Sequence, residues 1–306
     1  MYKIFIDGQE GTTGLKIFER FRDRNDFEIL KIDARDRKNL DKRLEYIEKA
    51  DITFLCLPDD AAKEIVKLVP ENAKIIDTST AHRTDDKWVY GMPELEADAR
   101  AKIRNAFRVA SPGCHATGFI LSLRPLTDNG IVPKDHAFSC TSITGYSGGG
   151  KRLIKKYHEG NFTAPQQYAQ GQMHKHLPEM KKMAKIDRYP IFTPVVANYY
   201  SGMQVIVPLE KTIMKEAIGI KGLTEIYKDR YSDSKMIEVL EMSPEGMDMI
   251  PSDYMSGSNR LMLWVSGNDE RFCINTLYDN LGKGASGAAV QCMNIMLGIS
   301  EEEGLL

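Results

Sequence analysis

Cys114 is the residue whose surroundings most clearly predict chemistry. It follows an apolar run at residues 107–110 and a Pro-Gly turn at 112–113, and it precedes apolar residues 119–121. This order predicts a buried strand, a turn and the first turn of a helix. A thiol at a helix start faces backbone N–H groups and the positive end of the helix dipole, which favour the thiolate that attacks carbonyl carbon. The alternative is a small buried hydrophobic residue.

His174 and His176 form the second candidate reactive group. Their spacing predicts that both imidazoles lie on one side of an extended segment. One imidazole near Cys114 is sufficient for general acid–base catalysis, because its ordinary pKa is close to neutral pH. A metal site would need a third ligand and an open coordination position, so we predict no metal. Surface histidines are the alternative.

A glycine-rich segment follows the first predicted strand and opens the helix after it. Gly8, Gly11 and Gly14 are spaced around Thr12 and Thr13. Glycines let the backbone approach a pyrophosphate, whose charge then lies at the helix N-terminus, and the hydroxyls add donors. We therefore predict that these five residues bind a dinucleotide. The spacing is GxxGxxG rather than GxGxxG, so a turn that simply requires glycine is the alternative.

The end of the second predicted strand bears on the choice of cofactor. An acid such as Asp33 would bind the 2′-hydroxyl of NAD, whereas an arginine such as Arg35 or Arg37 would bind the 2′-phosphate of NADP. Two guanidinium groups can neutralise a phosphate dianion that Asp33 alone would repel, which favours NADP. A solvated loop of mixed charge is the alternative.

Residues 77–83 end another predicted strand, at the sheet edge where ligands collect in α/β proteins. Ser79 is predicted to contact the cofactor there. Arg83 could form a forked pair with a carboxylate or phosphate of the substrate, and a solvated arginine is the alternative.

Residues 145–152 resemble a P-loop in the spacing of Gly145, Gly150 and Lys151, but Arg152 replaces the Ser or Thr that would hold magnesium. Exposed N–H groups beside positive charge can still bind a phosphate or an oxyanion without a metal. A flexible hairpin loop is the alternative.

The first hundred residues alternate short apolar runs with segments of helical spacing. The predicted strands are residues 3–6, 27–32, 52–57 and 73–76, and the predicted helices are 15–22, 40–49 and 61–68. This order predicts an α/β protein with a Rossmann-type, doubly wound parallel sheet whose ligands lie at the carboxyl ends of the strands.

After Cys114 the chain has longer strands separated by Gly-rich and polar loops, which predicts an α+β domain. The strands expected here are residues 137–144, 189–196, 204–207 and 261–265. A helix at 286–297 is rich in small residues and is expected to pack on the first domain, so the second domain is an insertion. We predict a dinucleotide-binding domain at 1–114, completed by 284–306, and a substrate and dimerisation domain at 115–283.

Composition argues against several classes of function. The 306 residues include 41 basic and 43 acidic side chains, a net charge of −2, so no overall field recruits nucleic acid or a membrane. No apolar run approaches the roughly 18 residues of a membrane span, and residues 1–7 lead directly into a strand, which leaves no room for a targeting peptide. Five cysteines without a CxxC pair indicate reduced thiols and a cytoplasmic location.

A series of motifs extends over essentially the whole chain. They are residues 5–15, 55–62, 77–83, 90–95, 112–114, 174–179, 198–203 and 279–291. Together they resemble the N-acetyl-gamma-glutamyl-phosphate reductases, enzymes of arginine biosynthesis, in their shorter form. A series this long and ordered is far more specific than one glycine pattern.

The resemblance implies a Rossmann domain that uses NADP(H) and an inserted α+β domain that makes subunit contacts in a homodimer or homotetramer. It assigns Cys114 as the nucleophile and His174 as the acid–base. The substrate pocket would contain Arg83, Ser147, Gly148, His176 and Glu179. Two residues beside the nucleophile depart from the family pattern: Ser111, where asparagine is usual, and His115, where tyrosine is usual. Neither departure removes a reactive group.

The reaction so implied is the NADPH-dependent reductive dephosphorylation of N-acetylglutamyl 5-phosphate to its semialdehyde, through a thioester on Cys114. An aspartyl, aminoadipyl or carrier-linked acyl phosphate is the alternative with the same chemistry, because one methylene changes affinity only modestly. A regulatory protein that binds NADP without catalysis, and an ATPase built on residues 145–151, are the alternatives from other classes.

Overall fold

The computed structural model describes residues 1–22, 24–215 and 218–306. The chain forms two compact units. The first unit is Met1–Gly113 with Ala285–Leu306, and the second is Cys114–Gly284. The second unit is therefore inserted into the first.

The first unit contains a six-stranded sheet in which every pair of neighbouring strands is parallel. In spatial order the strands are β2 (Phe27–Leu30), β1 (Tyr2–Asp7), β3 (Ile52–Leu55), β4 (Ile75–Asp77), β6 (Arg108–Ala110) and β5 (Val89–Tyr90). The chain leaves β1 toward one edge and returns on its other side as β3. The order therefore reverses between these two strands, where doubly wound sheets bind ligands.

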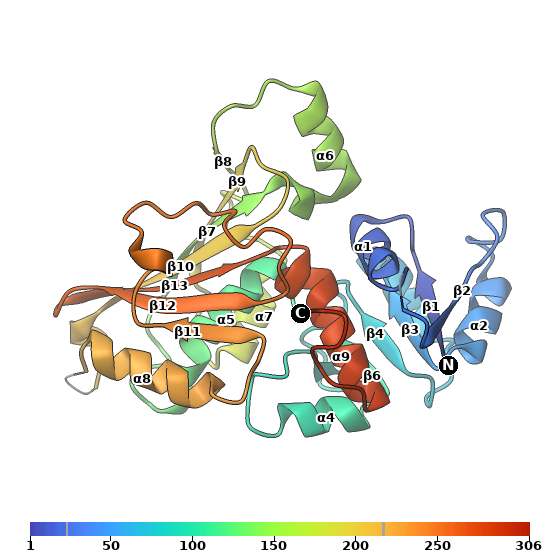
Figure 1. Cartoon of the computed structure of the whole chain (residues 1–306), viewed down its shortest axis with the longest axis horizontal. Coiled ribbons are helices and arrows are strands. Elements are labelled where there is room, and N and C mark those ends of the chain that lie inside the picture. The colour runs from blue at the N-terminus through green and yellow to red at the C-terminus, as the bar shows by residue number, and fades with distance from the viewer. Residues whose placement is uncertain (23, 216–217) are drawn as a thin grey trace. The chain divides into compact units, whose positions relative to one another are not determined.

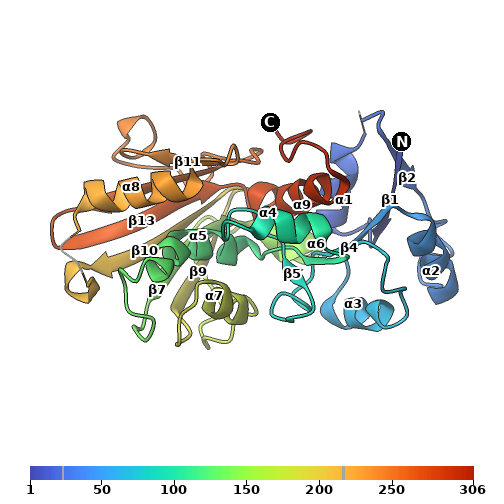
Figure 2. The ribbon, with the colours of Figure 1, turned by 90° about the horizontal axis from the view of Figure 1, so that it is seen from below.

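Helices cover both faces of this sheet, as Figures 1 and 2 show. One face carries α1 (Thr12–Arg20), α4 (Ala99–Asn105) and α9 (Gly287–Leu297), and the other carries α2 (Leu40–Lys49) and α3 (Asp59–Val66). Under α2 and α3 the core includes the fully buried Phe5, Ile47 and Ile65. Strands buried on both faces are almost entirely apolar, which is why β3 is apolar except for Thr53.

The second unit contains a seven-stranded mixed sheet. Its order is β11 (Ile237–Leu240), β12 (Leu261–Gly267), β13 (Arg271–Tyr278), β10 (Met203–Glu210), β7 (Ser139–Gly145), β9 (Ile191–Ala197) and β8 (Gln166–Gln167). The pairs β11–β12 and β7–β9 are parallel and the others are antiparallel.

The helix α5 (Cys114–Asp128) lies against β10 and β13 and is flanked by α7 (Leu177–Met183) and α8 (Ile220–Tyr231) (Figure 2). Gly118 permits this close approach, because a Cβ there would lie 2.5 Å from the hydroxyl oxygen of Thr276. The prediction of a doubly wound parallel sheet with an inserted α+β domain is confirmed. No helix in the described residues is long and apolar enough to cross a membrane.

Candidate active site

Cys114 is the first residue of α5, and the sheet below fixes this helix start. The hydroxyl of Tyr278 on β13 donates to the carbonyl oxygen of Cys114 at 2.6 Å and accepts from the N–H of Gly118 at 3.0 Å. A Cβ on Gly284 would lie 3.0 Å from the Cβ of Cys114, so glycine gives the nucleophile its space. The thiol is partly exposed at a helix N-terminus, where the dipole favours the thiolate.

The other four cysteines lie in surroundings that favour the neutral thiol. Burial raises the pKa of Cys56 to about 12 and also raises the pKa of Cys140 and of Cys273. Cys292 is fully buried in α9. Cys114 is thus distinguished from the rest by its position at a helix start.

This difference predicts selective alkylation of Cys114 by iodoacetamide at pH 8. A thiol of pKa about 12 is ionised to about one part in 10⁴ at that pH, whereas an ordinary thiol is ionised to about a quarter. Cys114 should therefore be labelled at least about 10²-fold faster than Cys56. Mass spectrometry of tryptic peptides measures both rates in one sample, and equal rates would remove the case for a reactive Cys114.

His174 and His176 lie side by side, with ring centroids 4.7 Å apart and ring planes at 83°. The expectation of an extended segment is wrong. His176 has helical backbone angles (φ −85°, ψ −12°) and immediately precedes α7, and its N–H donates to Nδ1 of His174 at 3.2 Å. The chain turns here because a proline near the start of α7 has the φ angle of a first helical turn.

Three other side chains complete a cluster of rings around the two histidines. His115, which follows Cys114, has its ring centroid 5.5 Å from that of His174, and Tyr168 and Phe192 have theirs 5.9 and 5.1 Å from it. Tyr168 was missed in the sequence because it lies in the loop after the two-residue strand β8, with no motif around it.

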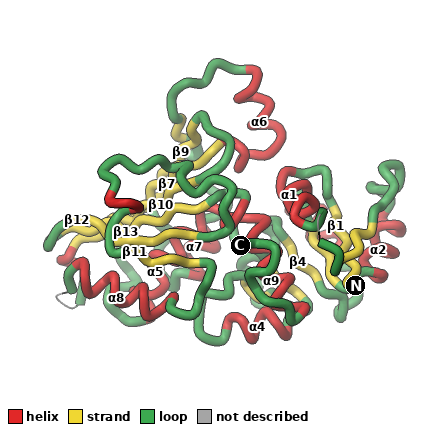
Figure 3. The backbone as a smooth tube through the Cα atoms, in the orientation of Figure 1, coloured by secondary structure: helices red, strands yellow, loops and turns green. Residues whose placement is uncertain are grey.

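The P-loop-like segment joins a strand to a helix. β7 ends at Gly145, a 3₁₀ turn covers Tyr146–Gly149, and α6 (Gly150–Glu159) follows, as the tube in Figure 3 shows. The hairpin alternative is therefore wrong. A strand that leads through glycines into a helix start has the N–H groups of an anion site.

Ser147 and Gly148 are held at the beginning of this turn by Asn280. The side-chain nitrogen of Asn280 donates to the hydroxyl oxygen of Ser147 at 3.0 Å, and its carbonyl oxygen accepts from the N–H of Gly202 at 2.9 Å. Ser147 is fully buried, so its side chain braces the loop from within. In the same unit Glu179 of α7 is 1% exposed, one helical turn after His176.

In the first unit, the glycine loop is built for close backbone contacts. Gly8 has a φ of +88°, and a Cβ there would lie 2.3 Å from the carbonyl oxygen of Cys56 at the end of β3. A Cβ on Gly14 would lie 2.6 Å from the carbonyl oxygen of Gly8. These two positions therefore require glycine, and the loop lies where the strand order reverses.

The start of α1 fits a pyrophosphate. Gly11 precedes the helix without a side chain to cap it, Thr12 and Thr13 are its first two residues, and its first turn has no acidic residue. Within this first turn no carboxylate opposes the N–H groups and the helix dipole, and the Glu10 that precedes Gly11 is exposed to solvent. These residues can hold a dinucleotide.

Arg35 lies in the loop after β2, where its guanidinium forms a forked pair with Asp33 at 3.1 and 3.2 Å. Hydrogen bonds from Arg35 lower the pKa of the Asp33 carboxyl. The Arg35 side chain is 89% exposed, so it remains accessible to a ligand. Because Asp33 is paired, it repels a 2′-phosphate less than a lone carboxylate would.

A buried carboxylate organises the loop that carries Ser79 and Arg83. Asp77, at the end of β4, accepts from the N–H and the hydroxyl of Ser79 at 2.9 and 2.8 Å and contacts Nδ1 of His82 at 2.7 Å. The guanidinium of Arg83 donates to the carbonyl oxygens of Ser111 at 2.8 Å and Thr78 at 3.0 Å. Arg83 is therefore buried against Ser111, which begins the turn before Cys114. The alternative of a solvated arginine is wrong.

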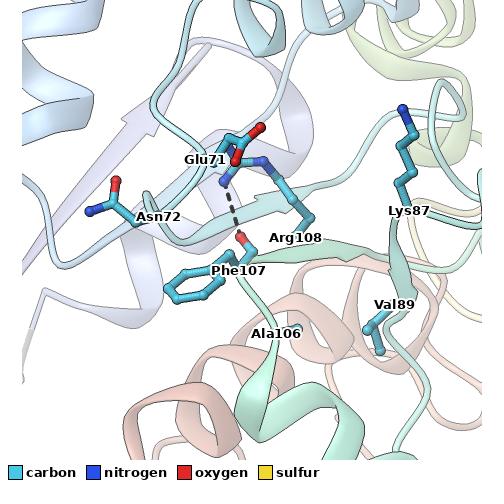
Figure 4. A pocket seen from close by; sticks show the side chains of 7 residues that line it. All are labelled: Glu71, Asn72, Lys87, Val89, Ala106, Phe107 and Arg108. Atoms are coloured by element: carbon cyan, nitrogen blue, oxygen red, sulfur yellow. Dashed lines mark hydrogen bonds between the residues drawn. The ribbon is translucent and has the colours of Figure 1, made fainter.

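A pocket of about 490 Å³ lies at the amino ends of strands of the parallel sheet (Figure 4). It is lined by Glu71, Asn72, Lys87, Val89, Ala106, Phe107 and Arg108. The guanidinium of Arg108 donates to the carbonyl oxygens of Pro70, Ala73 and Phe107, so its hydrogen bonds go to the backbone. The position of the pocket differs from that of the ligands of such sheets, which bind at the carboxyl ends of the strands.

Among the described residues no three metal-ligating side chains are grouped.

The structure therefore groups the predicted residues by unit. The second unit contains Cys114, Ser147, Gly148, His174, His176 and Glu179, and the first contains Gly8, Gly11, Thr12, Thr13, Gly14, Arg35, Ser79 and Arg83.

Comparisons with known proteins cover nearly the whole chain. Residues 3–103 match the model of the semialdehyde dehydrogenase NAD binding domain, and residues 114–280 match that of the semialdehyde dehydrogenase dimerisation domain. N-acetyl-gamma-glutamyl-phosphate reductases of Brucella ovis and Brucella canis are each 41% identical, over 97% of this chain and 99% of theirs.

Solved structures show the same fold at low identity. Aspartate semialdehyde dehydrogenase II of Vibrio cholerae is 17% identical with a TM-score of 0.73, over 97% of this chain and 99% of that one. Aspartate semialdehyde dehydrogenase of Candida albicans, solved with NADP, is 14% identical with a TM-score of 0.69, over 98% of this chain and 100% of that one. The chain belongs to the semialdehyde dehydrogenase family and, within it, to the N-acetyl-gamma-glutamyl-phosphate reductases.

Proposed function

We propose that this protein is an oxidoreductase of arginine biosynthesis that converts N-acetylglutamyl 5-phosphate and NADPH into N-acetylglutamate 5-semialdehyde, phosphate and NADP. The 41% identity to reductases of that name supports the substrate. The observation that carries the chemistry is the partly exposed thiol of Cys114 at the start of α5, in the unit that also holds the His174 cluster.

In the first half-reaction the thiolate of Cys114 attacks the acyl carbon of the substrate. The S–C bond forms, the C–O bond to phosphate breaks, and a thioester remains on the protein. His174 as imidazolium hydrogen-bonds the leaving phosphate oxygen. The N–H groups at the start of α5 stabilise the oxyanion of the tetrahedral intermediate.

The second half-reaction reduces the thioester. NADPH, when bound, would supply the hydride that the acyl carbon needs. His174 as imidazolium donates a proton to the thiohemiacetal oxygen and takes it back as the S–C bond breaks. Cys114 leaves as a thiolate, ready for another turnover. Gly8, Gly11, Thr12, Thr13 and Gly14 would hold the pyrophosphate, and Ser79 would lie beside the cofactor.

Substrate recognition is assigned to groups that match its two anionic ends. The resemblance assigns Arg83, His176 and Glu179 to the carboxylate end of the substrate. The segment that contains Ser147 and Gly148 would receive the phosphate at the start of α6, because the N–H groups of Tyr146 and Ser147 already donate to the carbonyl oxygens of Tyr199 and Tyr200. Burial of Ser147 against Asn280 supports a rigid turn in this role.

The preference for NADPH over NADH is assigned to Arg35. Arg35→Ala should raise the KM for NADPH about tenfold and leave the KM for NADH within about twofold, because one charge-assisted hydrogen bond to the 2′-phosphate is lost. Lys38→Ala removes the same charge from the same exposed loop and is the control. Equal KM values for NADPH and NADH in the unaltered protein would contradict the assignment.

We infer that the active form is a homodimer or homotetramer in the cytoplasm. The match of residues 114–280 to a dimerisation domain supports self-association. All five cysteines are free thiols, which suits a reducing compartment.

A panel of aldehydes tests the proposed function. The purified protein is assayed in the reverse direction with phosphate, NADP and the semialdehyde of N-acetylglutamate, aspartate or aminoadipate. The semialdehyde of N-acetylglutamate should be preferred by at least about 10²-fold in kcat/KM, because both its acetyl group and its chain length must fit the substrate pocket. A preference for another semialdehyde would replace the proposed substrate, and no turnover with any would favour a non-catalytic NADP-binding protein.

A further inference from the structure

We propose that His115 is a positioning residue for the thiol chemistry: its imidazole packs against His174, anchors the hydroxyl of Tyr168 and so fixes a second ring that lies beside His174. The inference rests on the proposed function, because it assigns a role in that reaction. The inference goes beyond that function, because the activity would then depend on His115, which lies beside the nucleophile and takes part in no chemical step.

Both nitrogens of the His115 ring meet hydroxyl groups. Nδ1 lies 2.6 Å from the hydroxyl oxygen of Ser142 on β7, and Nε2 lies 2.7 Å from that of Tyr168. His115 is 3% exposed and Ser142 is fully buried. The imidazole thus joins α5, the central part of the sheet and the loop after β8 by two short hydrogen bonds.

The ring of Tyr168 lies beside His174, as the ring of His115 itself does. The Tyr168 centroid lies 5.9 Å from that of His174, at an interplanar angle of 63°. The negative charge of the Cys114 thiolate is close enough to raise the pKa of the Tyr168 phenol further, beyond the effect of burial. The Tyr168 ring therefore packs beside His174, and its phenol is close enough to Cys114 for the thiolate charge to affect its pKa.

The anchor keeps the same charge through the reaction. Burial, and secondly the proximity of His174, lower the pKa of His115 to about 3, so its ring stays neutral near pH 7. The titratable groups that face it are Tyr168, His174 and His176. Because the phenol also keeps its proton, the hydrogen bond between His115 and Tyr168 persists whether His174 is protonated or not.

Two other roles for His115 fit these contacts less well. A general base needs a pKa near the working pH and a free nitrogen, whereas both nitrogens here face hydroxyls and the pKa is far lower. A position that only fills the core would be occupied more favourably by an apolar side chain, because burial of an imidazole costs free energy that only hydrogen bonds offset.

Amide substitutions separate the two hydrogen bonds. A glutamine side chain reaches about as far as Nε2 and an asparagine about as far as Nδ1, so His115→Gln can keep the bond to Tyr168 and His115→Asn only the bond to Ser142. We expect His115→Gln to retain kcat within about threefold and His115→Asn to lose about tenfold or more, with KM little changed in both. Loss of activity in both variants to the same degree, or in neither, would overturn the role.

A double-mutant cycle provides the second measurement. His115→Phe and Tyr168→Phe should each lower kcat by about tenfold or more, and the double variant should be no slower than the slower single one, because both remove the same contact. Losses that multiply would show independent roles and overturn the proposal. His136→Phe, a partly exposed histidine of the same unit, is the matched control, and thermal melting identifies any variant that does not fold.

Alkylation of Cys114 by iodoacetamide separates this inference from the proposed substrate. Its rate needs neither substrate nor cofactor, and it should fall in His115→Phe, His115→Asn and Tyr168→Phe and recover in His115→Gln. If the unaltered protein does not act on N-acetylglutamate 5-semialdehyde but the alkylation rates follow this order, the proposed function fails and the positioning role stands. If the protein acts on that substrate and the alkylation rates and kcat are the same in all variants, only the positioning role fails.

Discussion

Cys114→Ala is expected to lower kcat by at least about 10⁴-fold, because alanine cannot form the thioester through which both half-reactions pass. Binding of NADPH, followed by its fluorescence, should stay within about twofold of that of the unaltered protein. The glycine loop assigned to the cofactor lies in the first unit, whereas Cys114 begins the second. A loss of turnover with retained cofactor binding would separate the nucleophile from the folding of the cofactor domain.

Cys273→Ala is the matched control for this substitution. Cys273 lies on β13 in the same unit, is likewise partly buried, and has a raised pKa. It should keep kcat within about twofold, because no step of the reaction uses it. Residual activity of a few per cent in Cys114→Ala would mean that the acyl group is reduced without a covalent intermediate on this residue.

His174→Ala is expected to lower kcat by about 10² to 10⁴-fold, the usual contribution of a general acid–base. The pH profile of kcat should also lose the limb that the acid–base group imposes. Steady-state rates between pH 5.5 and 9 measure both effects. His136→Ala, in the same unit and partly exposed, should leave the rate and the profile unchanged.

His176→Ala distinguishes the two neighbouring imidazoles. A residue that binds substrate should affect KM more than kcat, so we expect KM to rise about tenfold and the pH limb to remain. The opposite outcome, with the pH limb lost in His176→Ala and kept in His174→Ala, would exchange the two roles. The rings are only 4.7 Å apart, so position alone does not separate them.

The first unit could be predicted from the sequence because its elements carry strong local patterns. The helix expected at residues 40–49 has those bounds, and β3 is apolar except for Thr53. Strand ends were less predictable: β3 ends at Leu55, two residues before the apolar run does. Cys56 still donates its N–H to the carbonyl oxygen of Asp7, and Pro58, which has no N–H to continue the pairing, then caps α3.

In the second unit the local signal was weaker, and β13 and α8 were not predicted. β13 contains Asn275 and Thr276, which are polar yet buried. The Asn275 side chain donates to the hydroxyl oxygen of Ser266 across the sheet and to the carbonyl oxygen of Cys273. Such partners come from strand pairing, which a single segment of sequence does not display.

The candidate site, too, could be predicted from the sequence only in part. Cys114 was predictable because the strand, turn and helix around it are contiguous. The contact between His115 and Tyr168 was not, because the two residues are 53 positions apart and meet only when α5 packs on the sheet. The backbone bend at His176 likewise depends on where α7 begins.

The phenol of Tyr278 has a consequence for attempts to transplant this thiol into another scaffold. Its oxygen stands between the carbonyl group of Cys114 and the N–H of Gly118, 164 and 160 residues earlier in the chain. A grafted peptide of residues 111–118 would carry the cysteine without the partner that shapes its first helical turn. A recipient protein would need a hydroxyl on a neighbouring strand to replace that of Tyr278. It would also need room for the helix to approach that strand as closely as Gly118 allows here.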